Sequence, residues 1–410
     1  MVYGLDSRPL VEFDHHSAGF ATDPSTFLRE LRDRCPVAWS ESHGGFWALT
    51  RFADVDRVLT DPATFSSRHD LDPGSPFLGV TIPPPPMAFV PVEMDPPESV
   101  AYRRILNPLF SPAAVDRLRP RIEHFTDFCL DRFAARGELD FVHDLTSPLP
   151  AMVTLDILGL PVDGWQRYAT TFHDMVAYPP GSPELEGAFA SAQAINEELR
   201  KLVDARRADP DRVRLGGVDA LIDAEIDGEP LPVDRLVDII RLILAGGIDT
   251  TTGAATGAFV YLGQHPEAKQ RLIDQPALLG GACEEFVRWI TPTPLLARTT
   301  TCPVDIDGVT IPEHERVMAN LAAANRDPAT FADPDDVVLD RTPNRHVAFG
   351  AGIHRCVGAN LARAEMEIMI AAVLRRMPDY EILTDGVSRY RTSGVQNGFV
   401  AARATFPPFA

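Results

Sequence analysis

A single cysteine in a glycine-rich stretch is the strongest chemical signal in the sequence. Residues 349–358 read FGAGIHRCVG, with Cys356 two positions after His354 and two before Gly358. Helical spacing begins directly afterwards, so the thiol stands at an expected helix N-terminus, where N–H groups and the helix dipole favour a thiolate. Glycines let a flat ligand approach the backbone without Cβ clashes. The pattern indicates a thiolate metal ligand beside a planar cofactor, with a buried structural cysteine as the alternative.

A second chemical pattern lies inside a long expected helix. Residues 246–250 read GGIDT, and each glycine in a helix interior costs about 1 kcal/mol relative to alanine. A helix with only a structural role would avoid that cost. Glycines permit close approach of a ligand, and the acid Asp249 beside the alcohol Thr250 can relay protons during oxygen activation. The alternative is close packing of small residues against a neighbouring helix.

Two weaker patterns concern arginines. Glu285 and Arg288 stand three residues apart on an expected helix face, a common pair worth about 0.3–0.5 kcal/mol at a surface. Arg103 follows a proline turn in DPPESVAYRR, and Arg298 ends the run LLAR. From the residues alone, Arg103 and Arg298 are expected to be ordinary charged side chains at the surface.

The elements that must position these groups are mostly helical. Apolar residues recur at helical spacing between proline or glycine clusters. This spacing predicts helices over 51–59, 98–109, 112–135, 144–159, 163–177, 184–208, 233–264, 278–290 and about 357–377. Short strands are expected at 45–50 and within 296–325, and residues 380–405 alternate like a hairpin. Because no linker divides the chain, we expect one domain over residues 1–410, mainly α with a small β-rich part.

Composition and charge exclude several classes of function. The chain has 410 residues, 45% of them apolar and 23% charged, which suffices for a core that encloses a prosthetic group. The net charge of -20 argues against a nucleic-acid partner, which would need a basic surface. The long apolar stretch 236–262 carries Asp238, Arg241 and Asp249, so we expect a buried helix and no membrane span.

The N-terminus and the cysteines indicate a compartment. Residues 1–6 contain no cationic segment followed by an apolar run, so no secretory signal is expected. The five cysteines are scattered and form no C-x-x-C pair. This predicts neither a disulfide framework nor a zinc site, and it fits a reducing cytoplasm. We expect a cytoplasmic monomer.

The string around Cys356 resembles the haem-binding loop of the cytochrome P-450 monooxygenases. The resemblance covers about residues 20–405, with the family's motifs in order. It implies the cytochrome P-450 fold, a triangular helical prism around a buried haem b, with Cys356 as the axial ligand of the iron. By the same resemblance Phe349, Gly350 and Gly358 form the haem loop, and His354 binds a haem propionate.

The other patterns also match this family. GGIDT is similar to its oxygen-activation motif, which implies that Asp249 aids proton delivery and that Thr250 hydrogen-bonds the dioxygen. Arg103 and Arg298 match arginines that bind the propionates. Ser99 stands where many relatives carry histidine, and serine is too short to copy that contact directly.

The pair Glu285 and Arg288 resembles the family's E-x-x-R motif. The run DPDDVVLDR, which ends at Arg341, resembles the segment that supplies a second arginine to that buried network. The implied role of these three residues is structural, on the haem-loop side of the fold.

The resemblance implies a monooxygenase that takes electrons from NAD(P)H through a separate ferredoxin reductase and ferredoxin. O₂ is split, with one oxygen atom entering a C–H bond and the other leaving as water. A peroxide-driven oxygenase is one alternative, although its relatives replace the acid–alcohol pair with Arg-Pro. A non-catalytic haem protein that binds a ligand or gas is the other, and it would need no proton relay.

The resemblance also places the walls of the substrate pocket, and nearly all of them are apolar. Such walls suit a compact hydrophobic substrate, such as a terpenoid, steroid or aromatic compound. The expected lining residues are Leu78, Val80, Ile82, Phe89, Met175, Val176, Leu242, Ala245, Gly246, Leu295, Leu296 and Val395.

Overall fold

The computed structural model describes residues 8–409, and most of them are helical. Residues 1–6, where the sequence predicts no secretory signal, lie outside the described residues. The α-helices are α1 (Ala18–Thr22), α2 (Pro24–Arg34), α3 (Phe52–Thr60), α4 (Glu98–Leu106), α5 (Pro112–Asp131), α6 (Pro148–Leu158), α7 (Trp165–Ala177), α8 (Pro183–Ala208), α9 (Gly217–Ile222), α10 (Val233–Gln264), α11 (Pro266–Asp274), α12 (Leu279–Ile290), α13 (Leu321–Ala324) and α14 (Ala359–Arg376).

Short turns of helix and short strands complete the fold. The helical turns are η1 (Ser42–Gly44), η2 (Asn107–Phe110), η3 (Val142–Thr146), η4 (Val162–Gly164), η5 (Pro276–Leu278) and η6 (Gly352–His354). The strands are β1 (Val37–Ser40), β2 (Phe46–Leu49), β3 (Phe65–Ser66), β4 (Glu138–Asp140), β5 (Glu225–Ile226), β6 (Glu229–Pro230), β7 (Leu295–Thr300), β8 (Val304–Ile306), β9 (Val309–Ile311), β10 (Arg316–Asn320), β11 (Glu381–Arg389) and β12 (Phe399–Thr405).

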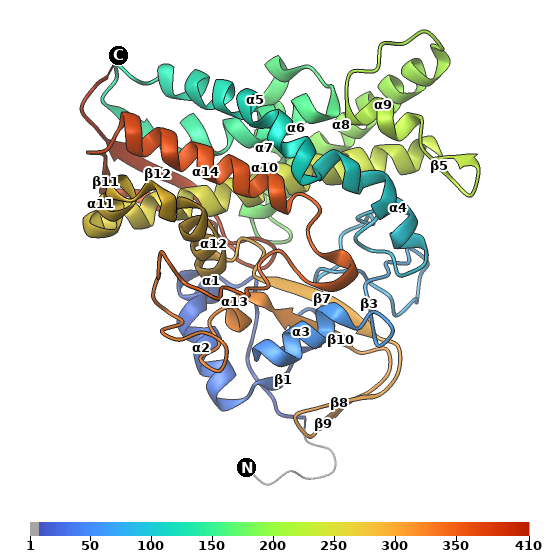
Figure 1. Ribbon diagram of the computed structural model, residues 1–410. Helices are drawn as coiled ribbons and strands as arrows, with labels where there is room; N and C mark the ends of the chain where they lie inside the picture. Colours follow the sequence, from blue (N-terminus) through green and yellow to red (C-terminus); the bar gives the residue numbers. More distant parts are fainter. Residues whose placement is uncertain (1–7, 410) are drawn as a thin grey trace.

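The long helices gather in one half of the molecule, and the larger sheet lies in the other half (Figure 1). That sheet has the strand order β1-β2-β10-β7-β3, with β10 parallel to β2 and antiparallel to β7. The C-terminal hairpin of β11 and β12 takes β4 as a third strand. The chain therefore crosses between the two halves several times.

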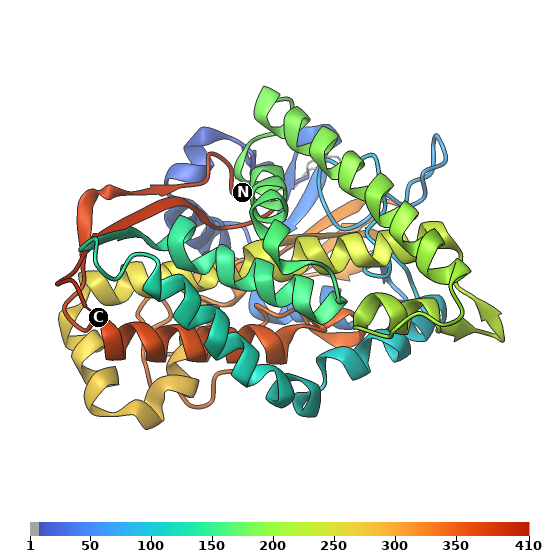
Figure 2. The ribbon, with the colours of Figure 1, turned by 90° about the horizontal axis from the view of Figure 1, so that it is seen from above.

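Helix α10 crosses the middle of the helical half, as the view from above shows (Figure 2). It packs against α6, α7, α8, α12 and α14, and most of its side chains are buried. Two of its glycines allow this close packing. A Cβ on Gly247 would lie 2.7 Å from Thr154 Oγ1, and one on Gly253 would lie 2.8 Å from the backbone oxygen of Asn397. Small residues thus let α6 and the C-terminal hairpin approach α10.

The predicted helices are present with small changes at their ends. The segment 233–264 is helical over its full predicted length. The helix predicted at 112–135 ends at Asp131, and the one predicted at 144–159 begins at Pro148, after the π-type turn η3. Capping explains where α5 and α8 begin. Ser111 and Ser182 are their N-cap residues, and each side chain accepts a hydrogen bond from a backbone N–H of the first turn. A proline in that first turn also favours the start of each helix.

The charged residues inside α10 are accommodated by partners. Arg241 forms an ion pair with Asp238 at 3.0 Å and donates to the backbone oxygen of Ala88 at 3.0 Å. Within residues 8–409, none of the helices has the length and apolar character needed to cross a membrane.

Candidate active site

A cavity of about 310 Å³ lies between α10 and the loop that carries Cys356. Leu242, Gly246 and Thr250 on α10 form part of one wall. Phe349, His354 and Cys356 belong to the facing wall, which continues into α14. The two strongest chemical patterns of the sequence therefore face each other across one cavity.

The cysteine loop holds the thiol toward this cavity. The Cys356 N–H donates to the backbone oxygen of Phe349 at 2.7 Å, which closes the loop before α14 begins at Ala359. Gly350 and Gly352 have φ values of 66° and 63°, in the left-handed region that glycine tolerates. The side chain of Cys356 is accessible from the cavity, although protein surrounds it on the other sides.

Two opposing effects act on the thiol. Burial raises the pKa of Cys356, and the Gly358 N–H and the charge of Arg103 partly offset that effect. A bound metal ion would add a far larger positive charge and deprotonate a coordinating thiol outright. The loop thus presents a sulfur that is ready for a metal but has little tendency to ionise without one.

Two arginines that form no ion pair within residues 8–409 lie near the cysteine loop, Arg298 fully buried and Arg103 half-buried. Arg298 is only 2% exposed, and its one hydrogen bond within residues 8–409 goes to the backbone oxygen of Ala297 at 2.8 Å. Burial lowers the pKa of Arg298 to about 10, with some relief from Asp95 and Glu93. Arg103 lines the cavity without an ion-pair partner in the described part of the chain, and burial lowers its pKa as well.

The imidazole of His354 lies close to these arginines. Burial, followed by the charges of Arg298 and Arg103, lowers the pKa of His354 to about 3, so the ring is neutral. Its Nε2 is 2.8 Å from Ser67 Oγ. The hydroxyl of Ser99 is also buried and has no hydrogen-bond partner within residues 8–409. Uncompensated cations and an unpaired hydroxyl are costly in a protein interior.

These observations fit haem b. A haem carries two propionate carboxylates, which would give the buried arginines their counter-ions and offer acceptors to Ser99 and His354. The glycines of the loop leave room for a flat ring, because a Cβ on Gly358 would lie 3.9 Å from Cys356 Sγ. The donor set therefore matches a dianionic planar cofactor with a thiolate-bound metal.

Thr250 faces the cavity, whereas Asp249 points away from it. The Thr250 hydroxyl donates to the backbone oxygen of Gly246 at 2.8 Å, one turn earlier in α10. A Cβ on Gly246 would meet nothing within 4 Å, so this glycine opens space in the cavity. Asp249 is 1% exposed and is not part of the cavity wall.

A buried network holds the Asp249 carboxylate behind α10. His173 Nδ1 lies 2.9 Å from Asp249 Oδ1, and the Tyr390 hydroxyl donates to Asp249 Oδ2 at 2.5 Å. Burial lowers the pKa of His173, but the attraction and hydrogen bond of Asp249 outweigh it, so the net direction is upward. Asp174 is half-buried next to His173 in sequence, and its charge adds to the upward shift in the pKa of His173. His173 and Tyr390 were not predicted, because nothing in their local sequence distinguishes them.

A second buried acid lines the cavity from α14. Glu365 is 1% exposed, and its Oε1 has no hydrogen-bond partner in residues 8–409. Burial raises the pKa of Glu365 to about 8, while a hydrogen bond with Thr251 acts in the opposite direction. The acid is therefore neutral at pH 7. Glu365 was not predicted, although an acid at an apolar position of the expected helix 357–377 was a signal that could have identified it.

The predicted pair of Glu285 and Arg288 is fully buried. Arg288 donates to both Glu285 oxygens at 2.7 and 2.8 Å, and Arg341 Nε lies 3.0 Å from each of them. Arg288 also donates to the backbone oxygens of Asn325 and Pro334 at 2.8 Å. The network thus joins α12 to the segment that leads into the cysteine loop.

Of the predicted substrate residues, Leu242, Gly246 and Leu296 line the cavity. Ile82 and Leu295 instead pack in a hydrophobic cluster with Phe13, because apolar spacing alone does not separate core from cavity. The predicted residues that do not line it are Leu78, Val80, Ile82, Phe89, Met175, Val176, Ala245, Leu295 and Val395.

Five further lining residues on α10 were not predicted, namely Ile239, Ile243, Gly247, Thr251 and Ala254. They stand on the same face as Leu242, Gly246 and Thr250, at steps of three or four residues. This helical spacing was the signal that could have identified them.

Known proteins similar to this chain cover nearly all of it. The family model described as cytochrome P450 matches residues 274–378. Steroid C26-monooxygenase of Mycobacterium tuberculosis is 32% identical over 387 residues, which span 93% of this chain and 93% of that protein. Linalool 8-monooxygenase of Pseudomonas putida is 31% identical, over 92% of this chain and 93% of that protein.

Solved cytochrome P450 structures also superpose on nearly the whole chain. The Mycobacterium marinum cytochrome P450 CYP268A2 in complex with pseudoionone superposes with a TM-score of 0.87 and 27% identity, covering 98% of this chain and 100% of that one. CYP109E1 from Bacillus megaterium in complex with testosterone gives a TM-score of 0.83 and 27% identity, over 95% and 99% of the two chains. Both likenesses therefore span nearly the whole of each chain.

Proposed function

This chain belongs to the cytochrome P450 family, and from that membership we propose that it oxidises a compact, neutral, hydrophobic molecule. It is a monooxygenase with haem b as its cofactor and shares the fold of its relatives. The observation that supports the proposal best is the cavity itself, with the Cys356 thiol on one wall and the Thr250 hydroxyl on the other. We propose that all 410 residues form one such domain.

Different residues of the chain would bind the iron, the ring and the propionates of the cofactor. Cys356 supplies the thiolate ligand, the loop glycines accept the ring, and Arg103, Arg298 and Ser99 bind the propionates. When bound, haem supplies the oxidation chemistry: O₂, two electrons and two protons convert a C–H bond to C–OH and release one water. His354 would act as a hydrogen-bond partner at the propionates, beside Arg103 and Arg298.

Asp249 and Thr250 would deliver the two protons. Asp249 cannot reach the cavity in its present rotamer, because His173 and Tyr390 hold both carboxylate oxygens. Protons would enter from the Asp174 side, pass through the His173 ring to Asp249, and reach Thr250 when the carboxylate turns along α10. Thr250 Oγ1 would then hold the proton at the cavity wall, and general acid catalysis of this kind contributes about 10²–10⁴-fold.

The substrate class follows from the cavity walls and from the relatives. Away from the propionate side the lining contains Ile239, Leu242, Ile243 and Leu296. Walls of this kind favour a terpenoid or steroid skeleton without charge, and the relatives named above act on a steroid and on linalool. In a spin-shift titration, a neutral steroid or monoterpenoid should bind at least tenfold more tightly than its carboxylated analogue. Equal affinities would contradict the proposal that the apolar cavity walls select a neutral substrate.

Electron supply and location complete the proposal. We propose that a ferredoxin, reduced by an NAD(P)H-dependent reductase, donates electrons at the face behind Cys356. We also propose that the protein is a cytoplasmic monomer, a location consistent with five free thiols in the structure.

The test of the thiolate uses the reduced carbon monoxide complex. The native protein should show the Soret band at the long wavelength typical of thiolate ligation, and Cys356→His should show the shorter wavelength of imidazole ligation. A short-wavelength band in folded native protein would overturn the assignment of Cys356.

The test of the relay uses Thr250→Ala, with Thr250→Ser as the control that keeps the hydroxyl. The alanine variant should consume NAD(P)H but release more of the electrons as hydrogen peroxide. The serine variant should stay close to the native ratio of product to NAD(P)H. Unchanged coupling in Thr250→Ala would contradict the role given to this residue.

A further inference from the structure

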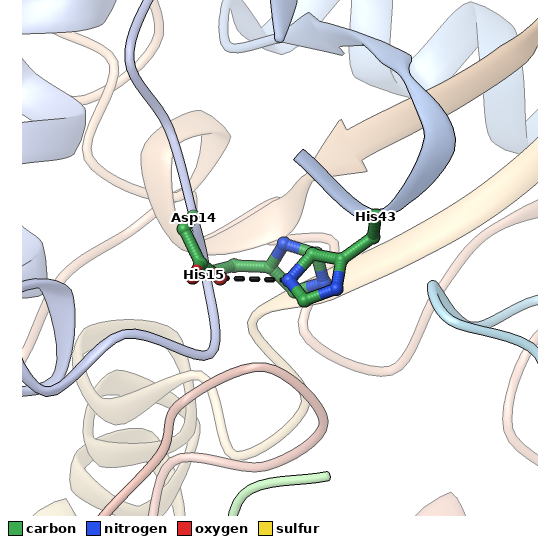
Figure 3. Close-up of side chains that lie close together, drawn as sticks. All are labelled: Asp14, His15 and His43. Carbon is green, nitrogen blue, oxygen red and sulfur yellow. Dashed lines mark hydrogen bonds and ion pairs between the residues drawn. The ribbon is translucent and has the colours of Figure 1, made fainter. Parts of the chain in front are cut away.

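A cluster of three histidines and one aspartate lies far along the chain from every residue of the haem site. Asp14, His15 and His16 are consecutive, and His43 belongs to the turn η1. The His15 ring centroid lies 4.4 Å from that of His16 and 5.1 Å from that of His43. Figure 3 shows Asp14, His15 and His43 meeting, and one ligand-type atom from each of them lies within 4.8 Å of the other two.

One backbone carbonyl fixes the proton positions on two of the rings. The Ile82 oxygen lies 2.6 Å from His15 Nε2 and 2.9 Å from His16 Nε2. A carbonyl only accepts hydrogen bonds, so both Nε2 atoms carry the proton. His16 uses its other nitrogen as well, with Nδ1 at 2.9 Å from Thr392 Oγ1. His16 is thus satisfied and serves as a wall of the cluster.

His15 keeps one free lone pair. Its side chain is fully buried, and its Nδ1 has no partner within residues 8–409. Burial, followed by the neighbouring His16, lowers the pKa of His15 to about 3, so the ring remains neutral and Nδ1 remains an electron-pair donor. A ring that donates its opposite N–H to a backbone carbonyl is the usual arrangement of a metal-binding histidine. Without an ion, the same Nδ1 is an unpaired buried acceptor, which is unfavourable.

Asp14 and His43 complete a ligand set on the more accessible side. His43 Nε2 lies 2.7 Å from Asp14 Oδ1, and their side chains are 21% and 44% exposed. Burial raises the pKa of Asp14, but the hydrogen bonds from His43 and the His16 N–H together lower it by a larger amount. The net pKa lies below the ordinary value, so the carboxylate is ionised. Both side chains can therefore move to accept an ion that enters from solvent.

We propose that Asp14, His15 and His43 bind one divalent transition-metal ion of the zinc class. Two imidazole nitrogens and a carboxylate suit Zn²⁺, with water as the fourth ligand. Ligand atoms at ~2.0–2.1 Å from a tetrahedral ion stand ~3.3 Å apart. The His43–Asp14 contact of 2.7 Å needs to open by about 0.6 Å to reach that spacing.

The ion would tie together parts of the chain that are distant in sequence. His15 and His16 already hold Ile82 in the 71–94 loop, and His16 holds Thr392 between the strands of the C-terminal hairpin. Gly394 packs on the His16 ring so closely that a Cβ there would lie 2.3 Å from it. A metal at His15 and His43 would fix η1 to this junction. Its role would be structural, at the outer edge of the loop region.

The experiment measures zinc binding by the haem-loaded full chain without a histidine tag. Protein treated with a chelator, which leaves haem iron in place, is titrated with Zn²⁺ against a competing chromophoric chelator, and bound zinc is counted by mass spectrometry. Asp14→Asn and His43→Asn each change one proposed ligand at the accessible side. Asparagine suits position 43, where φ is 52°.

His314→Asn is the matched control. His314 is also exposed beside a carboxylate, 3.5 Å from Glu313, and has a left-handed φ of 64°. We expect one zinc per native chain and per His314→Asn chain, and at least tenfold weaker binding in Asp14→Asn and His43→Asn. The proposal is overturned if the native protein binds no stoichiometric zinc or if His43→Asn binds it as tightly as the native chain.

The carbon monoxide spectrum of each sample separates this proposal from the proposed function. Zinc binding with an unexpected haem spectrum would count against the assignment of Cys356 alone. A normal haem spectrum without zinc binding would count against the metal site alone.

Discussion

At the scale of single residues, proton delivery depends on what holds the carboxylate of Asp249. A family resemblance assigns this acid to proton delivery, but it does not say what holds the acid at rest. The carboxylate is bound by His173 and Tyr390, which lie 76 and 141 residues away in sequence. Such distant partners leave no local pattern. The network makes proton delivery depend on a histidine, whose charge changes near neutral pH.

His173 should give stability that depends on pH. Its pKa is raised in the folded protein, so the folded state binds the proton more tightly than the unfolded state. The contribution is fully present below pH 6.5, the ordinary value, and is lost as pH rises through the raised value. His173→Gln should therefore be less stable than the native protein at acidic pH, by on the order of 1 kcal/mol for each pH unit of the shift. The gap should close in alkaline solution.

Denaturant unfolding of the haem-loaded proteins between acidic and alkaline pH measures this gap. Tyr390→Phe is the control, because burial raises the pKa of Tyr390 well above 10 and the hydroxyl does not titrate in this range. Its loss of stability should stay constant with pH. A gap for His173→Gln that widens as pH rises would contradict the ion pair.

Glu365 should also make the native protein less stable as pH rises, in this case because burial disfavours its ionised form. Its pKa is raised from 4.5 to about 8, so between these values the folded protein keeps a proton that the unfolded chain has lost. The native protein therefore loses stability as pH rises from about 4.5 to 8, by an amount on the order of a few kcal/mol. Glu365→Gln removes this titration and should become more stable than the native protein toward pH 8. Melting curves of both proteins across this range check it, and parallel pH profiles would refute a neutral Glu365.

At the scale of elements, α10 shows why one type of residue serves several purposes. Gly246 borders open space in the cavity, whereas Gly253 lies against the backbone of the C-terminal hairpin. In the sequence both are simply glycines in a helix. Their distinct surroundings follow from the packing of α6, α14 and the hairpin around α10, which apolar spacing does not specify.

This difference predicts opposite effects of the same substitution. Gly246→Ala meets no atom within 4 Å and should stabilise the protein by up to about 1 kcal/mol through helix propensity. Gly253→Ala places a Cβ 2.8 Å from the Asn397 backbone oxygen and should destabilise it by about 1–3 kcal/mol. Urea unfolding of the two variants measures both. Equal changes would mean that the hairpin moves freely relative to α10.

The sequence predicted elements better than their contacts. The helix boundaries at 233–264 follow from long apolar spacing with proline before the first turn. The larger sheet could not be predicted, because β10 pairs with β2 and β7, and β2 is more than 250 residues away in sequence. At the site, the cysteine string and GGIDT identify residues that the fold brings to one cavity. The apolar wall was harder to predict, because Val80 or Leu295 can serve equally in a core.

At the scale of the whole molecule, three exposed arginines that stand close in sequence to residues of the haem site carry positive charge on an acidic protein. Arg104, Arg345 and Arg355 are exposed and form no ion pair within residues 8–409. Arg363, seven residues after Cys356, is paired with Glu284 and stacked on Phe349. The available charge therefore comes from three arginines. A net charge of -20 would otherwise repel an acidic ferredoxin.

Reversing one of these charges should weaken the encounter with ferredoxin. Arg345→Glu should raise the apparent KM for an acidic ferredoxin severalfold at low ionic strength, with a smaller effect in high salt. Lys201→Glu, on the exposed side of α8, makes the same charge change away from the cysteine loop and should leave KM near the native value. Steady-state turnover at several ferredoxin concentrations compares them, and an equal rise in both variants would place the docking face elsewhere.

The buried Arg298 has a consequence for the life of the protein in a cell. Its guanidinium lies in the interior, and no carboxylate of residues 8–409 is in contact with it. The propionates would cancel that unfavourable charge, so part of the free energy of cofactor binding would appear as folding stability. We therefore expect chains made during haem shortage to unfold and be degraded first. The abundance of the enzyme would then follow the haem supply without any dedicated regulator.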